Sequence, residues 1–203
     1  MSMETKTLLG VDDLRVTFPT RTGLIEAVRG VSFSLGRERL GIVGESGSGK
    51  SQTGRAIMGL TPPQARISAN KLAFDSIDLL GISPRERRAL RGNRIAMILQ
   101  DPKYSLDPVM SIGRQIVETL RTHEKVSKAE ARERALAMLE AVQIRDPKRV
   151  YDLHPHEVSG GMGQRAMIAM MLIAGPEMMI ADEPTSALDV TVQLDVLGIL
   201  DKL

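Results

Sequence analysis

A glycine-rich turn with the sequence GESGSGKS contains residues whose types and spacing suit a phosphate ligand. It fits the pattern G-x-x-x-x-G-K-[ST], with Gly44, Gly49, Lys50 and Ser51 at the fixed positions. Glycines allow positive φ and close approach of the backbone to a ligand, so successive N–H groups can point inward around an anion. Lys50 can lie between a β- and a γ-phosphate, and the Ser51 hydroxyl can ligate Mg²⁺. The turn therefore predicts a site for a nucleotide with its Mg²⁺.

The segments on both sides of this turn decide between phosphate binding and a chance match to the pattern. An apolar run with Leu40, Ile42 and Val43 precedes the turn, and residues 50–60 have helix-forming character. We expect the run to be a buried strand, and the helix to point the positive end of its dipole at the ligand. This order of strand, turn and helix is the context that a phosphate-binding loop requires, so it favours the functional interpretation.

A pair of adjacent carboxylates, Asp182 and Glu183, follows the apolar run 178–181. In a parallel α/β sheet, ligands bind at the carboxyl ends of the strands. Side chains alternate in direction along a strand, so one acid can help to hold Mg²⁺ while the other faces an attacking water. We assign Asp182 to the metal and Glu183 to the general base. An acidic strand end or helix cap is the alternative, and the phosphate loop in the same chain weakens it.

A third segment, SGGMGQR at residues 159–165, opens a predicted helix. A serine and two glycines at a helix N-terminus form a second anion site, although such turns are common and weak evidence alone. Two phosphate-binding helix starts in one chain are explained if two chains pair head to tail. Each chain would then give its second site to the other's nucleotide.

The composition is that of an ordinary globular chain, with 203 residues, 42% hydrophobic and 26% charged, a net charge of +2 and no cysteine. The length allows one large domain, and the charge is too small to argue for nucleic acid. The lack of cysteine excludes disulfides and Cys-ligated metals within this sequence. No run approaches the roughly 20 apolar residues of a membrane span, and the first residues do not resemble a signal peptide. We expect a chain that is cytoplasmic, or attached to a membrane through a partner.

The elements that must position these residues follow from hydrophobic periodicity and turn signals. Alternating residues predict antiparallel strands at 8–18 and 24–35 and an edge strand at 67–74. Continuous apolar runs predict buried parallel strands at 95–99 and 178–181. Helices are expected at 84–91, 111–121, 127–142, 161–174 and 190–203, with a linker marked by Pro147 and Pro155.

Motifs occur in the order and approximate spacing of ABC transporter ATPase subunits. They are GESGSGKS at 44–51, Gln100 after an apolar strand, VSGGMGQR at 158–165, IADEP at 180–184 and SALD at 186–189. They resemble the Walker A, Q-loop, signature, Walker B and D-loop motifs of that family. The longer strings QDPKYSLDPVMSIGRQI, HPHEVSGGMGQR and ADEPTSALDVTVQ resemble the dipeptide, oligopeptide and nickel importer subfamily, and the resemblance covers nearly the whole chain. The chain departs from the pattern at Val158 and Gly163, where the family usually has Leu and Arg.

The resemblance implies an α/β fold of the P-loop NTPase class. It would have a RecA-like core of mostly parallel sheet, an N-terminal antiparallel β portion and an inserted α-helical subdomain. Residues 1–203 would form a single nucleotide-binding domain, incomplete at its C-terminus. Within it, residues 1–100 and 176–203 would form the core, and residues 101–175 the helical subdomain with the signature motif.

The resemblance also implies a role for each matched residue. Glu183 and Gln100 would be catalytic, and Ser51, Gln100 and Asp182 would hold Mg²⁺. Phe18 would stack on the adenine, unless it is simply a core residue. The nucleotide would be bound by residues of both chains of a dimer: Phe18, Gly44, Glu45, Ser46, Gly47, Ser48, Gly49, Lys50, Ser51, Gln52, Ser159, Gly160, Gly161 and Asp189.

The function implied by the resemblance is that of the ATP-binding subunit of an ABC importer. It would be an ATPase that uses ATP and Mg²⁺ and couples hydrolysis to uptake of peptides or a similar small solute. Its partners would be transmembrane permease subunits, a second ATP-binding subunit and, indirectly, an extracytoplasmic solute-binding protein, with no nucleic acid. It would lie at the cytoplasmic face of the bacterial inner membrane as a peripheral subunit.

Two alternatives stay open. A soluble ABC ATPase acting on nucleic acid or the ribosome would need a long coiled coil or a linker between two cassettes, and no heptad run lies between Ser51 and Ser159. The second alternative is a truncated remnant without catalytic activity. It stays open because members of the family continue past Leu203 into a strand that ends in a histidine at the γ-phosphate. In the fold that this chain resembles, that strand would lie in the sheet between the strands ending at Gly44 and Asp182. We therefore expect residues 1–203 alone to fold poorly and to hydrolyse no ATP, since unpaired buried backbone groups are costly.

Overall fold

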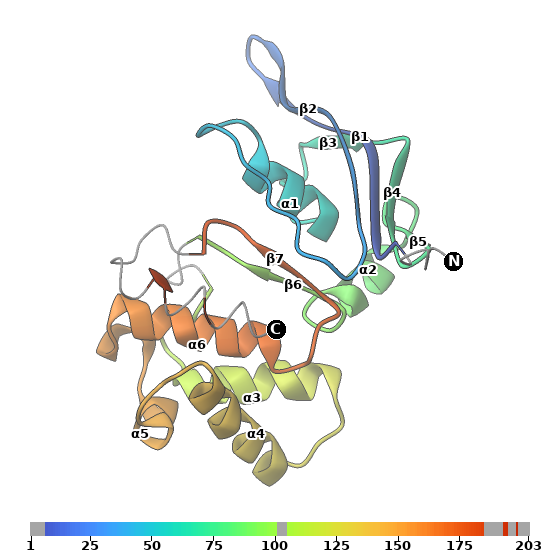
Figure 1. The fold of residues 1–203 in the computed structure, drawn as a ribbon. Helices are drawn as coiled ribbons and strands as arrows, with labels where there is room; N and C mark the ends of the chain where they lie inside the picture. Colours follow the sequence, from blue (N-terminus) through green and yellow to red (C-terminus); the bar gives the residue numbers. More distant parts are fainter. Residues whose placement is uncertain (1–6, 101–104, 185–192, 195–197, 199–203) are drawn as a thin grey trace. The chain divides into compact units, whose positions relative to one another are not determined.

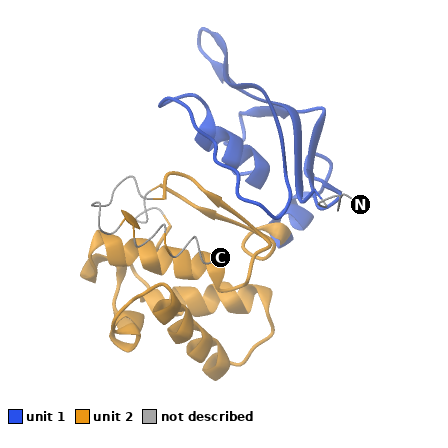
Figure 2. Cartoon of the chain, in the orientation of Figure 1, with its two compact units in different colours: residues 1–89 blue, residues 90–203 orange. Residues whose placement is uncertain are grey.

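The computed structural model describes residues 7–100, 105–184, 193–194 and 198. Contacts divide the chain into two compact units, Met1–Ala89 and Leu90–Leu203 (Figure 2). Unit 1 contains an antiparallel sheet and the glycine-rich turn, and unit 2 contains a parallel strand pair and most of the helices (Figure 1). None of the described helices is long and apolar enough to span a membrane.

The sheet of unit 1 is built around one long strand, β1 (Leu9–Thr20). A two-residue turn joins it to β2 (Gly23–Leu35), its antiparallel partner. On its other edge β1 pairs with β3 (Arg66–Ser68) and β4 (Lys71–Phe74), and β5 (Ile77–Asp78) pairs with β4. All of these pairs are antiparallel, as alternating sequences with short connections predict.

A bulge in β1 keeps its apolar residues on one face. Strict alternation would place Val11 and Leu14 on opposite faces, because they are an odd number of positions apart. Between them the register against β2 shifts, and Asp13 adopts a φ of 47°. Val11 and Leu14 are therefore both buried, at 4% and 0% exposure.

Helix α1 (Lys50–Met58) contacts β1 and β2 within unit 1. Gly49 precedes it and Gly59 ends it, and both glycines adopt left-handed backbone. This conformation at the C-terminal glycine lets its N–H bond to carbonyls of the last turn. A shorter helix, α2 (Pro84–Leu90), has all but its last residue in unit 1.

Unit 2 contains a parallel pair of strands, β6 (Ile95–Ile98) and β7 (Met178–Ala181). All four residues of β6 are buried, as its uninterrupted apolar sequence predicts. Arg94 and Glu177 form an ion pair with Nη2 and Oε2 2.9 Å apart, one position before each strand begins. The strands pair with Ile95 opposite Met178 and Ile98 opposite Ala181, so their carboxyl ends are aligned.

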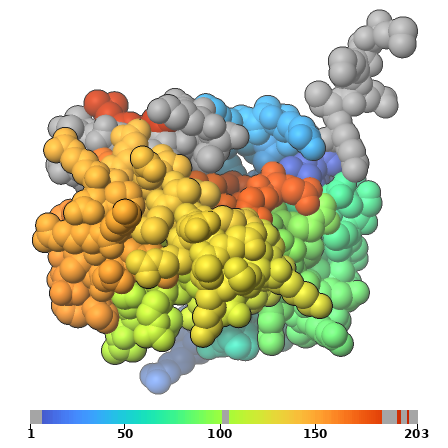
Figure 3. All heavy atoms as spheres, turned by 90° about the horizontal axis from the view of Figure 1, so that it is seen from below, coloured from blue at the N-terminus to red at the C-terminus, as the bar shows by residue number. Residues whose placement is uncertain are grey.

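The main core of unit 2 lies among helices α3 (Ile112–His123), α4 (Lys128–Ala141), α5 (Pro147–Asp152) and α6 (Gly160–Leu172). Apolar residues three and four positions apart form the buried stripe of each long helix. In the space-filling view, α4, in yellow, adjoins the α5–α6 segment, in orange, on one face of this unit (Figure 3). The fully buried members include Ile112, Ile116, Leu120, Ala131, Ala135, Leu139, Met167 and Ile168.

Several sequence predictions need correction. Residues 40–43 were expected to form a buried strand, but they carry no strand, and Val43 is 93% exposed. No described strand pairs with this run, so its backbone lacks the ladder that would make it a strand. The expected edge strand 67–74 is two strands, of which β4 lies between β1 and β5. The expected linker contains helix α5, and most of the helix predicted at 190–203 lies outside the described residues.

Candidate functional site

The glycine-rich loop of unit 1 connects β2 to α1, and its residues 44–48 are exposed. Gly47 and Gly49 adopt φ values of 79° and 96°, which glycine alone tolerates at little cost. A Cβ on Gly49 would also collide with the carbonyl oxygen of Ala27 in β2. The loop therefore takes its shape from glycines at the positions that the motif specifies.

Lys50 folds back over this loop. Its ammonium donates hydrogen bonds to the carbonyl oxygens of Gly44 and Glu45, at 2.8 and 2.9 Å. Because α1 begins at Lys50, its N-terminus, which is the positive end of the helix dipole, meets the loop. Ser51 belongs to this turn and is partly exposed. A cation, a hydroxyl and the N-terminus of a helix thus gather at one loop, which suits an anion with an associated metal ion.

For two other residues of unit 1 that were predicted to bind the nucleotide, the structure gives less direct support for that role. Phe18 lies in β1 opposite Ile25 and is half-buried. The Oε1 atom of Gln52 is buried and has no hydrogen-bond partner. Among the remaining predicted loop residues, the Ser48 N–H donates to the Glu45 carbonyl at 3.2 Å, which closes the turn. Stacking of Phe18 on adenine stays a prediction.

The two carboxylates that follow β7 occupy different surroundings, as strand geometry predicts. Asp182 is 9% exposed, and its N–H donates to the Ile98 carbonyl at 3.0 Å. Glu183 is exposed and adopts a φ of 46°, in the left-handed region that side chains rarely occupy. Buried and exposed acids in adjacent positions can serve different purposes, one held in place and one accessible to solvent.

Parallel pairing of β6 and β7 brings Gln100 next to Glu183. The Gln100 amide donates from Nε2 to Glu183 Oε2 at 3.0 Å, between residues 83 positions apart in the sequence. The sequence singled out both residues, and the structure places them in contact. An amide and a carboxylate at the carboxyl ends of paired parallel strands can together orient a water molecule.

The SGG segment starts helix α6 as predicted. Ser159 is the N-cap, and its Oγ accepts a hydrogen bond from the Met162 N–H at 3.3 Å. Gly160 and Gly161 form the first turn, so the exposed N–H groups of this turn are not shielded by side chains. Just before it, Glu157 and His154 cap the preceding 3₁₀ turn.

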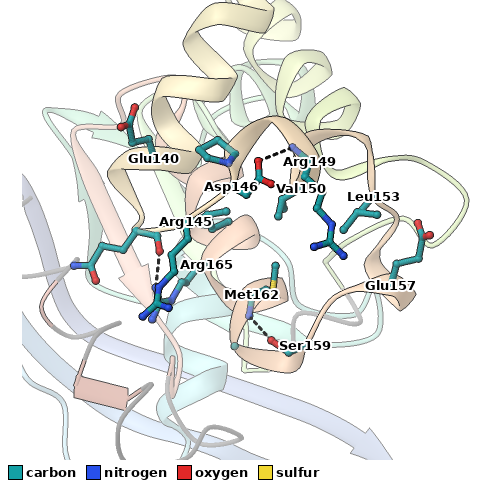
Figure 4. Close-up of a pocket in the computed structure, with 14 residues that line it drawn as sticks. Glu140, Arg145, Asp146, Arg149, Val150, Leu153, Glu157, Ser159, Met162 and Arg165 are labelled. Atoms are coloured by element: carbon teal, nitrogen blue, oxygen red, sulfur yellow. Dashed lines mark hydrogen bonds between the residues drawn. The ribbon is translucent and has the colours of Figure 1, made fainter.

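Beside this helix start lies a pocket of about 910 Å³, which the sequence did not indicate (Figure 4). Ser159 and Gly161 line it together with Arg145, Arg149 and Arg165. The Arg165 Nη1 donates to the Gln143 carbonyl at 2.8 Å, which holds this arginine near the end of α4. The sequence treated this segment as a linker, although Asp146 and Pro147 are a typical helix start.

The predicted site residues fall into two groups. Phe18 and the loop from Gly44 to Gln52 belong to unit 1, whereas Gln100, Asp182, Glu183 and Ser159 belong to unit 2. Asp189 lies outside the described residues. No group of three or more His, Cys, Asp or Glu side chains that could hold a metal ion occurs in the part of the chain that is described.

Known proteins share both the motifs and the fold. The family model described as ABC transporter matches residues 28–186. The chain belongs to the ABC transporter family. It is 49% identical over 197 residues to the oligopeptide transport ATP-binding protein OppD of Salmonella typhimurium, an alignment that covers 97% of this chain and 58% of OppD. It is 51% identical over 195 residues to the probable peptide ABC transporter ATP-binding protein y4tR of Sinorhizobium fredii, covering 95% of this chain and 58% of that protein.

The chain thus spans less than two thirds of the length of these curated relatives. Among solved structures, it is similar to a dimeric ATP-binding cassette in a post-hydrolysis state, bound to ADP and Pi. The TM-score is 0.86 at 26% identity, and the match covers 96% of this chain and 82% of that one. The α/β P-loop fold predicted from the sequence is confirmed, and so is the resemblance to peptide ABC transporter subunits.

Proposed function

We propose that this ABC family chain binds and hydrolyses ATP as the energy-supplying subunit of a peptide importer. One observation carries the proposal more than any other. Gln100 and Glu183 are in hydrogen-bond contact at the carboxyl ends of β6 and β7, next to the nearly buried Asp182. This arrangement is suited to phosphoryl transfer, where positioning and electrostatic stabilisation account for most of the catalysis.

ATP fits the glycine-rich loop of unit 1. The left-handed Gly47 and Gly49 open the backbone, and Lys50 places an ammonium at the same loop. Gly44, Glu45, Ser46 and Ser48 complete the loop, and Ser51 and Gln52 the first helical turn. In this proposal Phe18 stacks on the adenine ring.

The resemblance of the motifs assigns Mg²⁺ to Ser51, Gln100 and Asp182, and their hydroxyl, amide and carboxylate oxygens are of the hard kind that this ion prefers. When bound, Mg²⁺ would neutralise charge on the phosphate oxygens. Asp182 is held rigidly for such a role by its N–H bond to Ile98.

Glu183 would act as the general base. Its carboxylate is exposed and accepts a hydrogen bond from the Gln100 amide, so one oxygen is oriented while the other can accept a proton from water. Gln100 would keep that carboxylate directed at the attacking water.

The signature segment would serve a second subunit. Ser159, Gly160 and Gly161 form a helix start, and Ser159 and Gly161 line a pocket together with three arginines, a setting favourable to phosphate. The similar solved cassette is described as dimeric. We infer that two ATP-binding subunits pair head to tail, with Asp189 at their interface, and that they work with transmembrane permease subunits and an extracytoplasmic solute-binding protein. The subunit would then be peripheral, at the cytoplasmic face of the inner membrane.

Peptides are the proposed solute class. The relatives are named for oligopeptide and peptide transport, and another, the dipeptide transport ATP-binding protein DppD of Escherichia coli, is 47% identical over 197 residues, covering 97% of this chain and 60% of that protein. The alternative of a soluble ATPase with a coiled-coil arm gains no support from the described residues, where the longest helix has 14 residues.

Substitution of Glu183 by Gln tests the proposal. In the intact protein, Glu183→Gln should retain ATP binding but lower the rate of phosphate release by at least 100-fold, because an amide keeps the shape and cannot accept a proton. Glu133→Gln, at an exposed position of α4, is the matched control and should hydrolyse ATP at the unmodified rate. Hydrolysis by Glu183→Gln at the rate of the control would refute the assignment of the base.

A further inference from the structure

Gln164 is a buried polar residue that the proposed chemistry does not use. It lies in α6, one turn after Ser159, and its side chain is only 1% exposed. Its Nε2 donates a hydrogen bond to the carbonyl oxygen of Pro184 at 2.7 Å. A buried amide is costly unless it is hydrogen-bonded, so this contact accounts for a polar residue among apolar neighbours.

The carbonyl that Gln164 holds belongs to the residue directly after Glu183. Glu183 has a φ of 46°, whereas a residue before proline normally adopts extended backbone. Such conformations persist only where the surrounding structure over-determines them, and they concentrate at active sites. The turn at Glu183 therefore needs contacts that hold it on both sides.

Three contacts of this kind surround Glu183. On the preceding side, the Asp182 N–H donates to the Ile98 carbonyl at the end of β6. The Glu183 carboxylate itself accepts from Gln100. On the following side, Pro184 has no N–H to donate, so its carbonyl is its only backbone hydrogen-bonding group, and Gln164 binds it.

We propose that Gln164 is a positioning residue that couples the signature helix to the catalytic carboxylate. Ser159 and Gln164 belong to the same helix, so a displacement of α6 on binding a ligand at Ser159 is transmitted through the Gln164 amide to the turn that orients Glu183. The proposal rests on the function proposed above for Glu183. It assigns to α6 a second role, in addition to presenting its N-terminus to a phosphate.

The contact can be tested without any substitution. In the intact protein, the Nε2 hydrogens of Gln164 should exchange with solvent at least 10-fold more slowly than those of Gln143, an exposed glutamine of the same unit. Side-chain amide exchange followed by NMR measures both. Equal exchange rates would overturn the contact and the proposal with it.

Its effect on catalysis is tested with Gln164→Met, which keeps the length of the side chain and its helix propensity but removes the donor. Misplacement of a reacting group by about 1 Å can cost on the order of 100-fold in rate, so we expect kcat to fall at least 10-fold while KM for ATP changes less than twofold. Met167→Leu, at a buried position of the same helix, is the matched control for altered packing. Equal changes in kcat for the two variants would show that Gln164 is structural only.

A double-mutant cycle separates this proposal from the function on which it rests. The cycle compares ATP hydrolysis by Glu183→Gln with and without Gln164→Met. If Gln164 acts through Glu183, adding Gln164→Met to Glu183→Gln should lower the residual hydrolysis rate less than twofold. A full effect in that background would overturn the coupling. If Glu183→Gln alone left hydrolysis intact, the proposed base would fail instead.

Gln164→Asn provides a second variant should Gln164→Met unfold. It retains an amide one methylene short of Pro184, and it should give a kcat between those of Gln164→Met and the unmodified protein. Thermal unfolding of each variant shows whether it is folded. An Asn variant that is folded and fully active would contradict the proposal.

Discussion

At the scale of single residues, the site depends on contacts that keep polar side chains in place. Glu183 illustrates this, since its carboxylate is oriented by Gln100 and its backbone by contacts on both sides. Asp182 is held by strand pairing and is nearly buried. The same backbone therefore supplies a fixed acid and an accessible acid from adjacent positions, which suits one to a metal ion and the other to a proton.

Glu157, two residues before the signature serine, has a carboxylate held by His154. The His154 N–H donates to Glu157 Oε2 at 2.7 Å, and the His154 ring Nδ1 lies 3.1 Å from the same oxygen. Both contacts lower the pKa of Glu157, and the backbone hydrogen bond has the larger effect. Since the folded pKa is below the unfolded one, the carboxylate stabilises the fold above the ordinary glutamate pKa of about 4.3, and this contribution is lost as pH falls through the folded value.

We therefore expect the pKa of Glu157, measured by NMR titration of its carboxyl carbon, to lie below the ordinary value. In His154→Ala the pKa should rise only in part, because the backbone N–H that has the largest effect is still present. An unperturbed pKa in the native protein, or a complete return to the ordinary value in His154→Ala, would contradict this explanation.

At the scale of secondary structure elements, Gly163 is a weak point of α6. It lies inside the helix, and a Cβ added to it would meet nothing within 4 Å. Glycine inside a helix is less favourable than alanine by about 1 kcal/mol, chiefly because of backbone entropy. Gly163→Ala should therefore raise the free energy of unfolding by roughly 0.5–1 kcal/mol, measured by urea denaturation.

Gly113 is the matched control, because it too lies inside a helix, α3. A Cβ there would overlap the ring of Tyr151, which packs directly on the Gly113 backbone. Gly113→Ala should lower stability despite its better helix propensity, by about 1–3 kcal/mol, as overpacking does. If both substitutions raised the free energy of unfolding, helix propensity alone would determine their effect and the contact with Tyr151 would be unimportant.

The sequence predicted those elements whose residues carry a strong local signal. The stripe of Ile112, Ile116 and Leu120 predicts α3, and the Ser127 cap of α4 is seen to accept the Glu130 N–H at 3.1 Å. The prediction from the sequence was wrong at residues 40–43. An apolar run there predicts a strand, but no described strand supplies hydrogen bonds to it. Helix α5 was missed because it is only six residues long, too short to show a periodic pattern.

At the scale of the whole molecule, the carboxylate site of unit 2 is assembled from segments far apart in the sequence. The motifs indicated the phosphate loop, Gln100 and the two acids, because their chemistry follows from residue types and spacing. The support of Glu183 by Gln164 was not predictable. It depends on the left-handed backbone at Glu183 and on how α6 packs beside the end of β7, and neither leaves a local pattern in the sequence.

ATP binding at the loop should raise the stability of the whole protein. A ligand that binds only the folded state at about 100 times its Kd adds about 2.7 kcal/mol to the free energy of unfolding, so MgATP should raise Tm by several degrees. Lys50→Ala should abolish this shift, because the remaining N–H groups of the loop cannot neutralise three phosphates. In Lys71→Ala, which removes a cation from β4 outside the loop, the shift should be retained. A Tm shift of equal size in both variants, measured by differential scanning fluorimetry over a range of MgATP concentrations, would place the nucleotide elsewhere on the chain.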